Sequence, residues 1–155
     1  MYHLLQQIDC IHNLLLKKLE HISPEEEAIL DGNPEIRRAI YMQSGSDVID
    51  AKKLLDSGRL IAIRPHTRFA HFPEHSHNYV EVVYMCHGTT THIANGKAVT
   101  LHPGELLFLG QGARQEILPA GKDDIAVNFI ILPQFFDKAL EMLDEGETQL
   151  RKFIV

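Results

Sequence analysis

The sequence has little cysteine, no tryptophan and no excess of positive charge. Its two cysteines, Cys10 and Cys86, stand too far apart for a metal-binding or redox motif. Isolated thiols fit a reducing compartment, where they behave as small apolar residues. The formal net charge of −6 disfavours nucleic acid or an anionic membrane as the direct partner of this chain, because both require a basic patch.

Long apolar runs are also missing. No stretch is long enough to span a bilayer. Polar residues such as Gln6, Asp9 and His12 interrupt the apolar residues near the N-terminus, unlike in a signal peptide. We therefore expect a cytoplasmic protein. With 155 residues, of which 45% are hydrophobic and 23% charged, the chain can form one globular domain with its own core.

The first part of the chain, residues 1–59, has the pattern of a helical extension. Apolar residues recur at helical spacing between Leu4 and Ile22, which predicts one amphipathic helix that packs on the domain or on a second copy. Ser23 and Pro24 predict the cap and the first position of a second helix. The further elements expected here are a turn at 31–34, a third helix reaching Ile40 or Met42, and a short strand with a helical turn within 48–55.

The pattern changes at Leu60. From there to Leu132, short apolar and β-branched runs are broken by Gly, Pro and Asn, which predicts an antiparallel sandwich or barrel. Asn95-Gly96 is a strong signal for a type I′ hairpin turn. Apolar residues after Pro133 recur at helical spacing and predict a C-terminal helix. Strands are expected at 60–64, near Phe69, and at 79–85, 89–94, 97–101, 105–109, 115–118 and 125–131.

The stretch from His75 to Gly88 carries the candidate chemistry. It is rich in Val and Tyr, so it is predicted to be one strand. Alternation along a strand then places His75, His77, Tyr79 and Glu81 on one face, which points inward in a small barrel. Two imidazoles and one carboxylate match the facial ligand set of a divalent metal. Without a metal, they can fix a small ligand in an apolar cavity.

This stretch resembles the first motif of the cupin superfamily. The matching pattern is His75-x-His77-x3-Glu81-x6-Gly88. The chain departs from the family at Phe69, where the motif normally opens with glycine. The three polar residues are therefore the ones that the resemblance carries over as a site.

A second, weaker match supports the first. Gly104 is followed, at the spacing of the second cupin motif, by Gly110, Gly112 and Gln115. The glycine skeleton is kept, while the last histidine of the motif is replaced by the amide of Gln115. Together the two motifs imply a mainly β fold, the double-stranded β-helix barrel or jelly roll of cupins, over residues 60–132.

The chain also resembles the N-terminal sensor half of bacterial AraC-type transcription regulators. The resemblance implies an effector-sensing and dimerising domain, with DNA bound by a C-terminal helix-turn-helix half that this sequence lacks. The changes of pattern at Leu60 and Pro133 divide the chain into a helical extension (1–59), a barrel (60–132) and a C-terminal helix (133–155). We expect a longer protein to continue after this helix. The segments that carry the likeness are Ile63 to Phe69, Phe72 to His77, Glu81 to Tyr84, Gly104 to Leu109, Gln115 to Ile117 and the Phe-rich segment after Pro133.

Three interpretations of the polar cluster stay open. His75, His77 and Glu81 could hold a divalent metal. The same three residues, with Tyr79 and Gln115, could line the pocket of a small-molecule effector such as a sugar or another metabolite. They could also form a satisfied hydrogen-bond network, with Tyr79 as a core aromatic residue. The amide of Gln115 is a weaker metal ligand than imidazole, which favours the metal-free pocket.

Three functions correspond to these interpretations. The first is a non-enzymatic effector sensor that dimerises and controls DNA binding by the missing half. The second is a metal-dependent cupin enzyme, such as a dioxygenase or an isomerase. The third is a dimerisation module whose barrel is filled by side chains. The other histidines and arginines singled out in the chain are expected to be solvated: His66, His71, His87, His92, His102, Arg64, Arg68 and Arg114.

Overall fold

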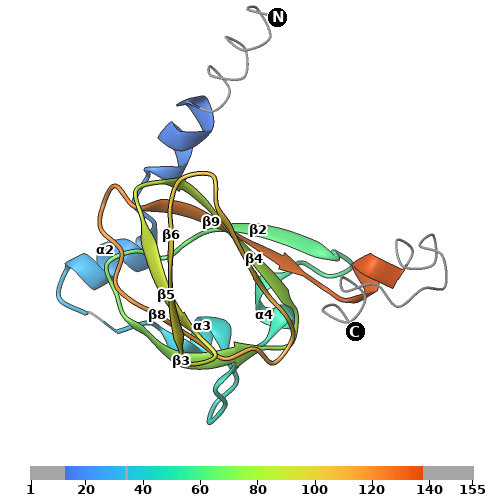
Figure 1. Cartoon of the computed structure of the whole chain (residues 1–155). Coiled ribbons are helices and arrows are strands. Elements are labelled where there is room, and N and C mark those ends of the chain that lie inside the picture. The colour runs from blue at the N-terminus through green and yellow to red at the C-terminus, as the bar shows by residue number, and fades with distance from the viewer. Residues whose placement is uncertain (1–12, 34, 138–155) are drawn as a thin grey trace, which may run out of the picture.

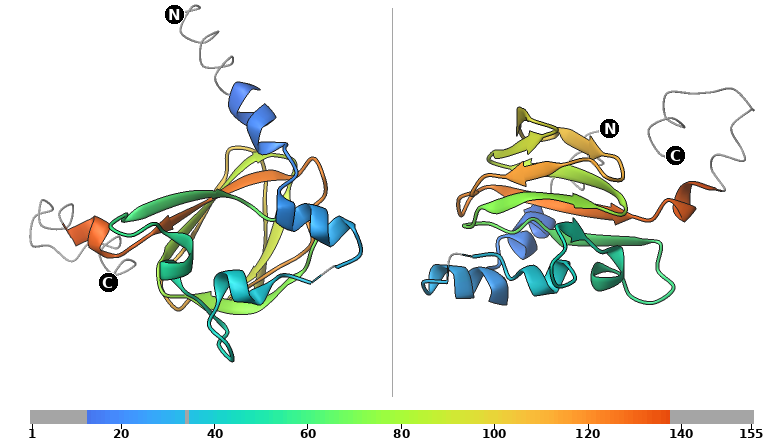
Figure 2. Two further views of the ribbon diagram at one scale, coloured as in Figure 1. Left: turned by 180° about the vertical axis from the view of Figure 1, so that it is seen from behind. Right: turned by 90° about the horizontal axis from the view of Figure 1, so that it is seen from below.

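Two facing β-sheets form the body of the protein, and short helices from the N-terminal part lie across one end of it (Figures 1 and 2). The computed structural model describes residues 13–33 and 35–137. Residues 13–19 are helical. The elements that follow are α2 (Pro24–Leu30), α3 (Arg38–Tyr41), β1 (Val48–Ile49), α4 (Ala51–Leu54), β2 (Ile61–Pro65), β3 (Phe72–His77), β4 (Val80–His87), β5 (Thr90–Ala94), β6 (Lys97–Leu101), β7 (Leu106–Leu109), β8 (Gln115–Ile117) and β9 (Ile125–Ile131).

The strand order confirms the jelly roll. One sheet has the order β1-β3-β8-β5-β6 and the other has the order β2-β9-β4-β7. Strands far apart in sequence are neighbours in each sheet, and the barrel pairs are antiparallel. The short strand β1, from the N-terminal part, adds to the first sheet in parallel with β3. The part of the chain before Leu60 therefore contributes a strand to the barrel wall.

Several predicted elements are confirmed, some to the residue. The strands β6 and β9 have the predicted bounds, and β5 begins one residue later than expected. Asn95 and Gly96 both have positive φ angles, 47° and 78°, as a type I′ turn requires. Helix α2 begins with the predicted cap: the side chain of Ser23 accepts from the backbone of Glu26, and the Glu26 carboxylate accepts from the backbone of Ser23.

The prediction of one strand over residues 75–88 is wrong. The chain leaves the first sheet at Asn78-Tyr79 and enters the opposite sheet as β4. The side chain of Asn78 holds this crossing, because it donates to Asp50 Oδ1 (3.1 Å) and accepts from the backbone of Ala51 (2.9 Å). The prediction overlooked Asn78, whose residue type is depleted in strands, because strand-forming residues follow it immediately.

Two further predictions differ from the structure. The third helix is only the four residues of α3, and its N-cap residue, Arg37, makes no side-chain capping bond. The strand expected near Phe69 begins at Phe72, and Phe69 itself has a φ of 70°, in the region that glycine prefers. The backbone therefore keeps the conformation that suits the glycine of the cupin motif, although a phenylalanine stands there.

The structure describes only part of the two predicted terminal helices. Residues 13–19 of the predicted amphipathic helix and residues 134–137 of the predicted C-terminal helix are helical. Residues 20–22 and Pro133 are described and are not helical, so the first helix ends at residue 19 and the other begins at residue 134. The remaining residues of both predictions lie outside the described residues. No helix in the described ranges is long and apolar enough to cross a membrane.

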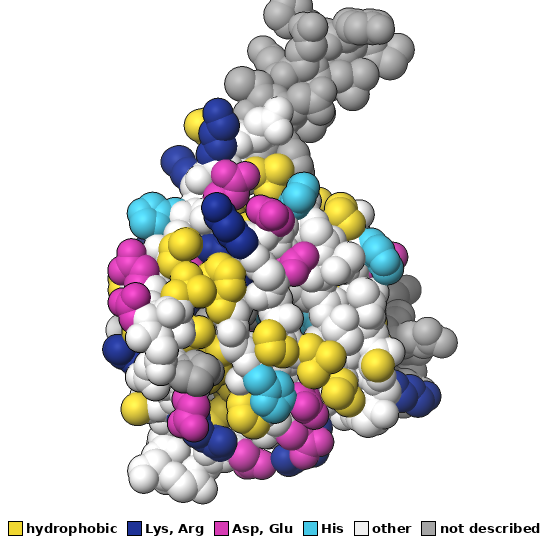
Figure 3. All heavy atoms as spheres, turned by 90° about the vertical axis from the view of Figure 1, so that its left-hand side faces the viewer, with side chains coloured by type: hydrophobic (Ala, Val, Ile, Leu, Met, Phe, Trp, Pro, Cys, Tyr) yellow, Lys and Arg dark blue, Asp and Glu magenta, His cyan; other side chains and the backbone are white. Residues whose placement is uncertain are grey.

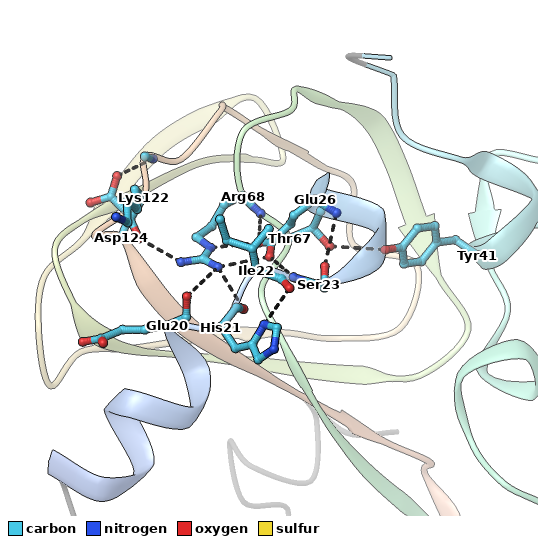
Figure 4. A network of polar contacts seen from close by, with 11 residues as sticks. Glu20, His21, Ile22, Ser23, Glu26, Tyr41, Thr67, Arg68, Lys122 and Asp124 are labelled. Carbon is cyan, nitrogen blue, oxygen red and sulfur yellow. Dashed lines mark hydrogen bonds and ion pairs between the residues drawn. The ribbon is translucent and has the colours of Figure 1, made fainter. Parts of the chain in front are cut away.

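A buried arginine joins the N-terminal helices to the barrel (Figure 4). Arg68 was expected to be solvated, but it is only 2% exposed. Its guanidinium binds both carboxylate oxygens of Glu26 in α2, at 2.8 and 3.1 Å. It also donates to the backbone carbonyls of Glu20, His21 and Lys122. Since these partners satisfy the buried charge, Arg68 fastens the helical part to the loop before β9.

The surface agrees with the charge of the sequence. On the face that Figure 3 shows, basic side chains are scattered among acidic and apolar ones and do not gather into one patch. The ion pairs of Arg114 with Asp47 and Glu74 are examples of such mixed charge at the surface. This face therefore lacks the basic footprint that a nucleic-acid surface requires.

Candidate functional site

Polar side chains from both sheets meet inside the barrel. His75 and His77 project from β3, Gln115 from the neighbouring β8, and Glu81 from β4 in the opposite sheet. None of the four is more than 4% exposed. The structure thus brings the predicted cluster together, although the residues reach it from two sheets and not from one strand face.

The amide of Gln115 is the centre of this cluster. Its nitrogen donates to Glu81 Oε2 and lies 3.4 Å from His77 Nε2. Its oxygen lies 3.2 Å from His92 Nδ1, and His92 Nε2 lies 3.2 Å from the hydroxyl of Thr90. One side chain therefore links two sheets and satisfies polar groups that burial would otherwise make costly.

A second amide extends the cluster on the other side of Glu81. Asn128 in β9 donates to Glu81 Oε1 (3.1 Å), and its oxygen lies 3.1 Å from His66 Nδ1. His66 and His92 are buried, so the expectation that they are solvated is wrong. Alternation along β9 could have placed Asn128 inside with Ile130, but the position of His66 just after β2 carries no such signal.

Aromatic rings pack the histidines in place. The ring of Tyr79 stacks on that of His77, with centroids 5.0 Å apart, and the ring of Phe72 lies 4.3 Å from that of His75. Tyr79 is 1% exposed and belongs to the apolar core. It also lines the cavity described next. Both interpretations of Tyr79 therefore fit its position.

A cavity of about 40 Å³ adjoins the cluster. This is room for a few water molecules, whereas pockets for metabolites commonly measure several hundred Å³. Its polar wall is formed by the cluster, and its apolar wall includes residues of the N-terminal part. The principal polar lining residues are Arg64, His66, His75, Glu81, Gln115 and Asn128, and those of the N-terminal part are Ile36, Tyr41, Ile49 and Leu54.

Burial controls the protonation of the cluster. It lowers the pKa of His77 and of His92 to about 4 each, and it also lowers the pKa values of His66 and His75. Burial raises the pKa of Glu81, although the proximity of His75 and the hydrogen bond from Gln115 act against it. The imidazoles are therefore neutral at physiological pH, and each has one donor and one acceptor nitrogen.

The cluster does not have the arrangement of a metal centre. Among the described residues, no three His, Cys, Asp or Glu side chains are placed so that they could hold a metal ion. His77 Nε2 and Glu81 Oε2 approach to 3.4 Å, but both face the amide nitrogen of Gln115. A metal at these two atoms would therefore have to displace the amide of Gln115.

The sequence of the barrel matches a known family model. Residues 57–144, more than half of the chain, match the AraC-like ligand-binding domain. The chain belongs to this family. Its buried polar cluster lies within the matched residues, whereas part of the cavity wall, including Tyr41 and Ile49, comes from residues that precede them.

Curated relatives of this AraC-like domain include the HTH-type transcriptional activator RhaS of Salmonella arizonae and that of Salmonella newport. Each is 36% identical over 63 residues, which is 40% of this chain and 23% of the relative. The chain therefore spans about a quarter of the length of these relatives.

Solved structures similar to this AraC-like domain include a cupin protein from Bacteroides fragilis and KdgF from Halomonas. The first is 21% identical with a TM-score of 0.38, and the match covers 57% of this chain and 70% of that one. The second is 14% identical with a TM-score of 0.39, and the match covers 50% and 84%.

Proposed function

We propose that this domain is a non-enzymatic sensor, in which a small-molecule effector bound at the barrel cluster controls DNA binding by a helix-turn-helix part of the full-length protein. The observation that carries the proposal is the buried cluster of His75, His77, Glu81 and Gln115 beside a cavity. Burying a polar group costs free energy unless it is hydrogen-bonded, and His75 Nε2 has no partner in the described structure. A barrel that needed only a core would be more simply filled with apolar side chains.

The small cavity suggests how binding is transmitted. Because about 40 Å³ cannot admit a whole metabolite, entry requires movement of the residues that form its apolar wall. Tyr41 and Ile49 belong to the N-terminal part, which Arg68 fastens to the barrel. An effector that binds only the opened barrel would shift the population toward it, which is the coupling that a sensor needs.

A ligand screen on the chain tests this proposal. Small metabolites are added to the wild-type domain, and stabilisation is measured as a rise in melting temperature. Compounds that bind the cluster should lose their effect in Glu81→Gln and keep it in Glu74→Gln, since Glu74 is exposed and bonds only to Arg114 in the described structure. If every stabilising compound acted equally on Glu81→Gln, the cluster would not be the effector site.

DNA binding is assigned to the missing C-terminal part. The relatives carry HTH in their names, and the acidic charge of this chain and the mixed surface of Figure 3 do not suit DNA. We therefore expect the full-length protein to retard promoter DNA in an electrophoretic assay at low salt. Retardation by residues 1–155 alone would show that this division of labour is wrong.

Dimerisation, the other role proposed for the domain, is supported by the outer face of the sheet β2-β9-β4-β7. Ile63, Phe129, Val82 and Phe108 lie side by side across its four strands. All four side chains in this row are apolar, and Ile63 is 61% exposed. A second copy of this face is a suitable partner because this row presents no charged side chain to be desolvated.

Sedimentation equilibrium tests that interface. Ile63→Lys should convert a dimer to a monomer, because it places a charge in the middle of an apolar contact. Arg114→Ala, at the mixed-charge surface, serves as the control and should leave the dimer intact. A wild-type chain that is monomeric at high concentration would contradict the dimer.

A metal-dependent enzyme is the second candidate, because His75, His77 and Glu81 do converge in the barrel. It requires Gln115 to give up its bonds to Glu81 and His77. Elemental analysis of chain purified without added metal separates the two candidates. Near-stoichiometric iron, manganese or nickel in the wild type would favour the enzyme, whereas metal retained only by Gln115→His would favour the sensor.

A further inference from the structure

We propose that the site recognises uncharged hydrogen-bond donors through two bare imidazole nitrogens, His66 Nε2 and His75 Nε2, and rejects anionic groups. This inference rests on the proposed effector site and names the chemistry of its ligand. It also adds His66 to the binding residues. The argument comes from where each imidazole proton must lie.

The tautomer of His75 is set by the backbone. Its Nδ1 lies 2.8 Å from the carbonyl oxygen of Pro73. A carbonyl oxygen only accepts hydrogen bonds, so Nδ1 carries the proton. Because the ring is neutral, its Nε2 has a lone pair and no proton.

The tautomer of His66 is set by a chain of two bonds. Asn128 donates its NH₂ group to Glu81 Oε1, which turns the amide oxygen toward His66. That oxygen lies 3.1 Å from His66 Nδ1 and can only accept. His66 therefore also carries its proton on Nδ1 and presents a bare Nε2.

The two other imidazoles of the cluster differ from these in one respect. His77 and His92 likewise have Nδ1 next to an oxygen that accepts, from Tyr79 and Gln115 respectively. Their Nε2 atoms, however, already have donors, because Gln115 approaches one and the Thr90 hydroxyl the other. These two rings are internally satisfied and need no ligand.

His66 Nε2 and His75 Nε2 are buried and have no hydrogen-bond partner in the described structure. Both residues are 3% exposed or less, and both line the same cavity. Leaving a buried acceptor unpaired costs free energy. A group that donates a hydrogen bond to each nitrogen would remove this cost. The two unpaired acceptors therefore specify a ligand with hydrogen-bond donors.

The charged groups that line the cavity further restrict the chemistry of the ligand. A carboxylate or phosphate at the two imidazole nitrogens offers only acceptors, which would face their lone pairs and the carboxylate of Glu81. Arg64 lines the same cavity and attracts an anion, but this attraction does not supply the hydrogens that the two nitrogens lack. An ammonium would approach Arg64, which also lines the cavity and lies 6.0 Å from the Tyr41 ring centroid. Neutral O–H or N–H groups avoid both conflicts. The cavity volume admits only such a head group, with the rest of the molecule toward the N-terminal wall.

The tautomers are measured directly by ¹⁵N NMR of the histidine rings in the 155-residue chain, assigned through backbone connectivities. We expect unprotonated-type Nε2 resonances from His66 and His75 near neutral pH. Ethylene glycol should move these two resonances toward protonated-type values more than it moves those of His77 and His92. Acetate of equal concentration and similar size should not. A protonated Nε2 on either ring, an equal response to acetate, or no response to ethylene glycol would overturn the proposal.

A variant of Asn128 tests whether the hydrogen bonds of this side chain set the tautomer of His66. Asn128→Leu removes the acceptor at His66 Nδ1, so His66 should acquire a partly protonated Nε2 while His75 keeps its bare nitrogen. An unchanged His66 would show that Asn128 does not set its tautomer, which also contradicts the proposal. Because these tautomers are read without effector, their failure leaves the sensor function standing. Failure of the ligand screen would leave the tautomers standing.

Discussion

The histidines inside the barrel should make stability depend on pH. Burial holds the pKa of His77 and of His92 near 4, below the ordinary 6.5 of an unfolded chain. The unfolded state therefore takes up protons first, and stability that is full above pH 6.5 is lost as pH falls toward 4. Each such histidine contributes about 1.4 kcal/mol per pH unit in that window. The raised pKa of Glu81 acts in the opposite direction, but one carboxyl group opposes several imidazoles.

Urea unfolding between pH 7.5 and 5 measures this dependence. The wild type should lose stability across the range, and His92→Gln should lose less because one buried imidazole is gone. His102→Gln, at an exposed position, should follow the wild type. A wild-type stability that stays constant or rises as the pH falls would show that the imidazoles are not held neutral.

Gly88 is required both by its backbone and by its surroundings. Its φ is 72°, and a Cβ atom there would lie 2.7 Å from the backbone oxygen of Asp123. Gly58 has a similar φ of 80° but nothing within 4 Å of such an atom. Gly58→Ala should cost about 1 kcal/mol from the backbone alone. Gly88→Ala should cost about 1–3 kcal/mol more through the clash, as measured by urea unfolding. Equal losses in the two variants would contradict the steric account.

Single residues were predicted from the sequence only where a local rule applies to them. The turn at Asn95-Gly96 and the cap at Ser23 depend on neighbours a few positions away, and both predictions are confirmed. Arg68, His66 and His92 were expected to be solvated because their residue types usually are. Each is buried by partners distant in sequence, such as Glu26 for Arg68, and no local pattern contains that information.

Among the elements, the stability of helix α2 should depend on the ion pair between Arg68 and Glu26. Burial raises the pKa of Glu26, but hydrogen bonds from Arg68 and Ser23 outweigh it and hold the pKa below its ordinary value. Glu26→Gln should therefore leave the buried guanidinium of Arg68 without its carboxylate, and Arg68→Met should leave the buried carboxylate of Glu26 without its cation. Either change should lower the free energy of unfolding by about 3–5 kcal/mol. Hydrogen exchange should also accelerate in α2 more than in the central strand β4.

The surface ion pairs of Arg114 provide the matched control. Arg114 bonds to Asp47 and Glu74 at 3.0 and 2.8 Å, but all three side chains are about half exposed. Exposed pairs of this kind are screened by solvent, so Arg114→Met should change neither stability nor exchange in α2 appreciably. If Arg68→Met were as mild as Arg114→Met, the buried pair would not be what fastens α2 to the barrel.

At the same scale, alternation and turn residues predicted most strands, but not which sheet each belongs to. The run from residue 75 to 88 was predicted as one strand, yet it divides between the two sheets at Asn78 and Tyr79. His75 and Glu81 still meet, because the sheets face each other and both side chains point into the space between them. Motif spacing therefore predicted that these residues cluster, but they meet across two sheets and not on one strand face; that the cluster is a binding site remains a prediction.

For the molecule as a whole, the sequence predicted the jelly roll. It did not predict that the N-terminal part forms one wall of the cavity. The N-terminal part was expected as an extension beside the barrel. Instead β1 joins a sheet, and Tyr41 and Ile49 form part of the cavity wall. The division at residue 60 remains a prediction about folding units, which these contacts do not decide. Packing between an extension and a barrel depends on shape complementarity, which hydrophobic periodicity does not encode.

The central claim is that small molecules bind inside the barrel and not on its outer face. NMR of isotope-labelled isoleucine methyl groups, with a stabilising compound from the ligand screen, tests it most directly. Ile130 lines the cavity, while Ile63 lies on the exposed outer face. We predict that the compound shifts the methyl resonances of Ile130 and Ile117 and leaves those of Ile63 unchanged. Shifts at Ile63 with none at Ile130 would place the ligand on the outer sheet and contradict the claim.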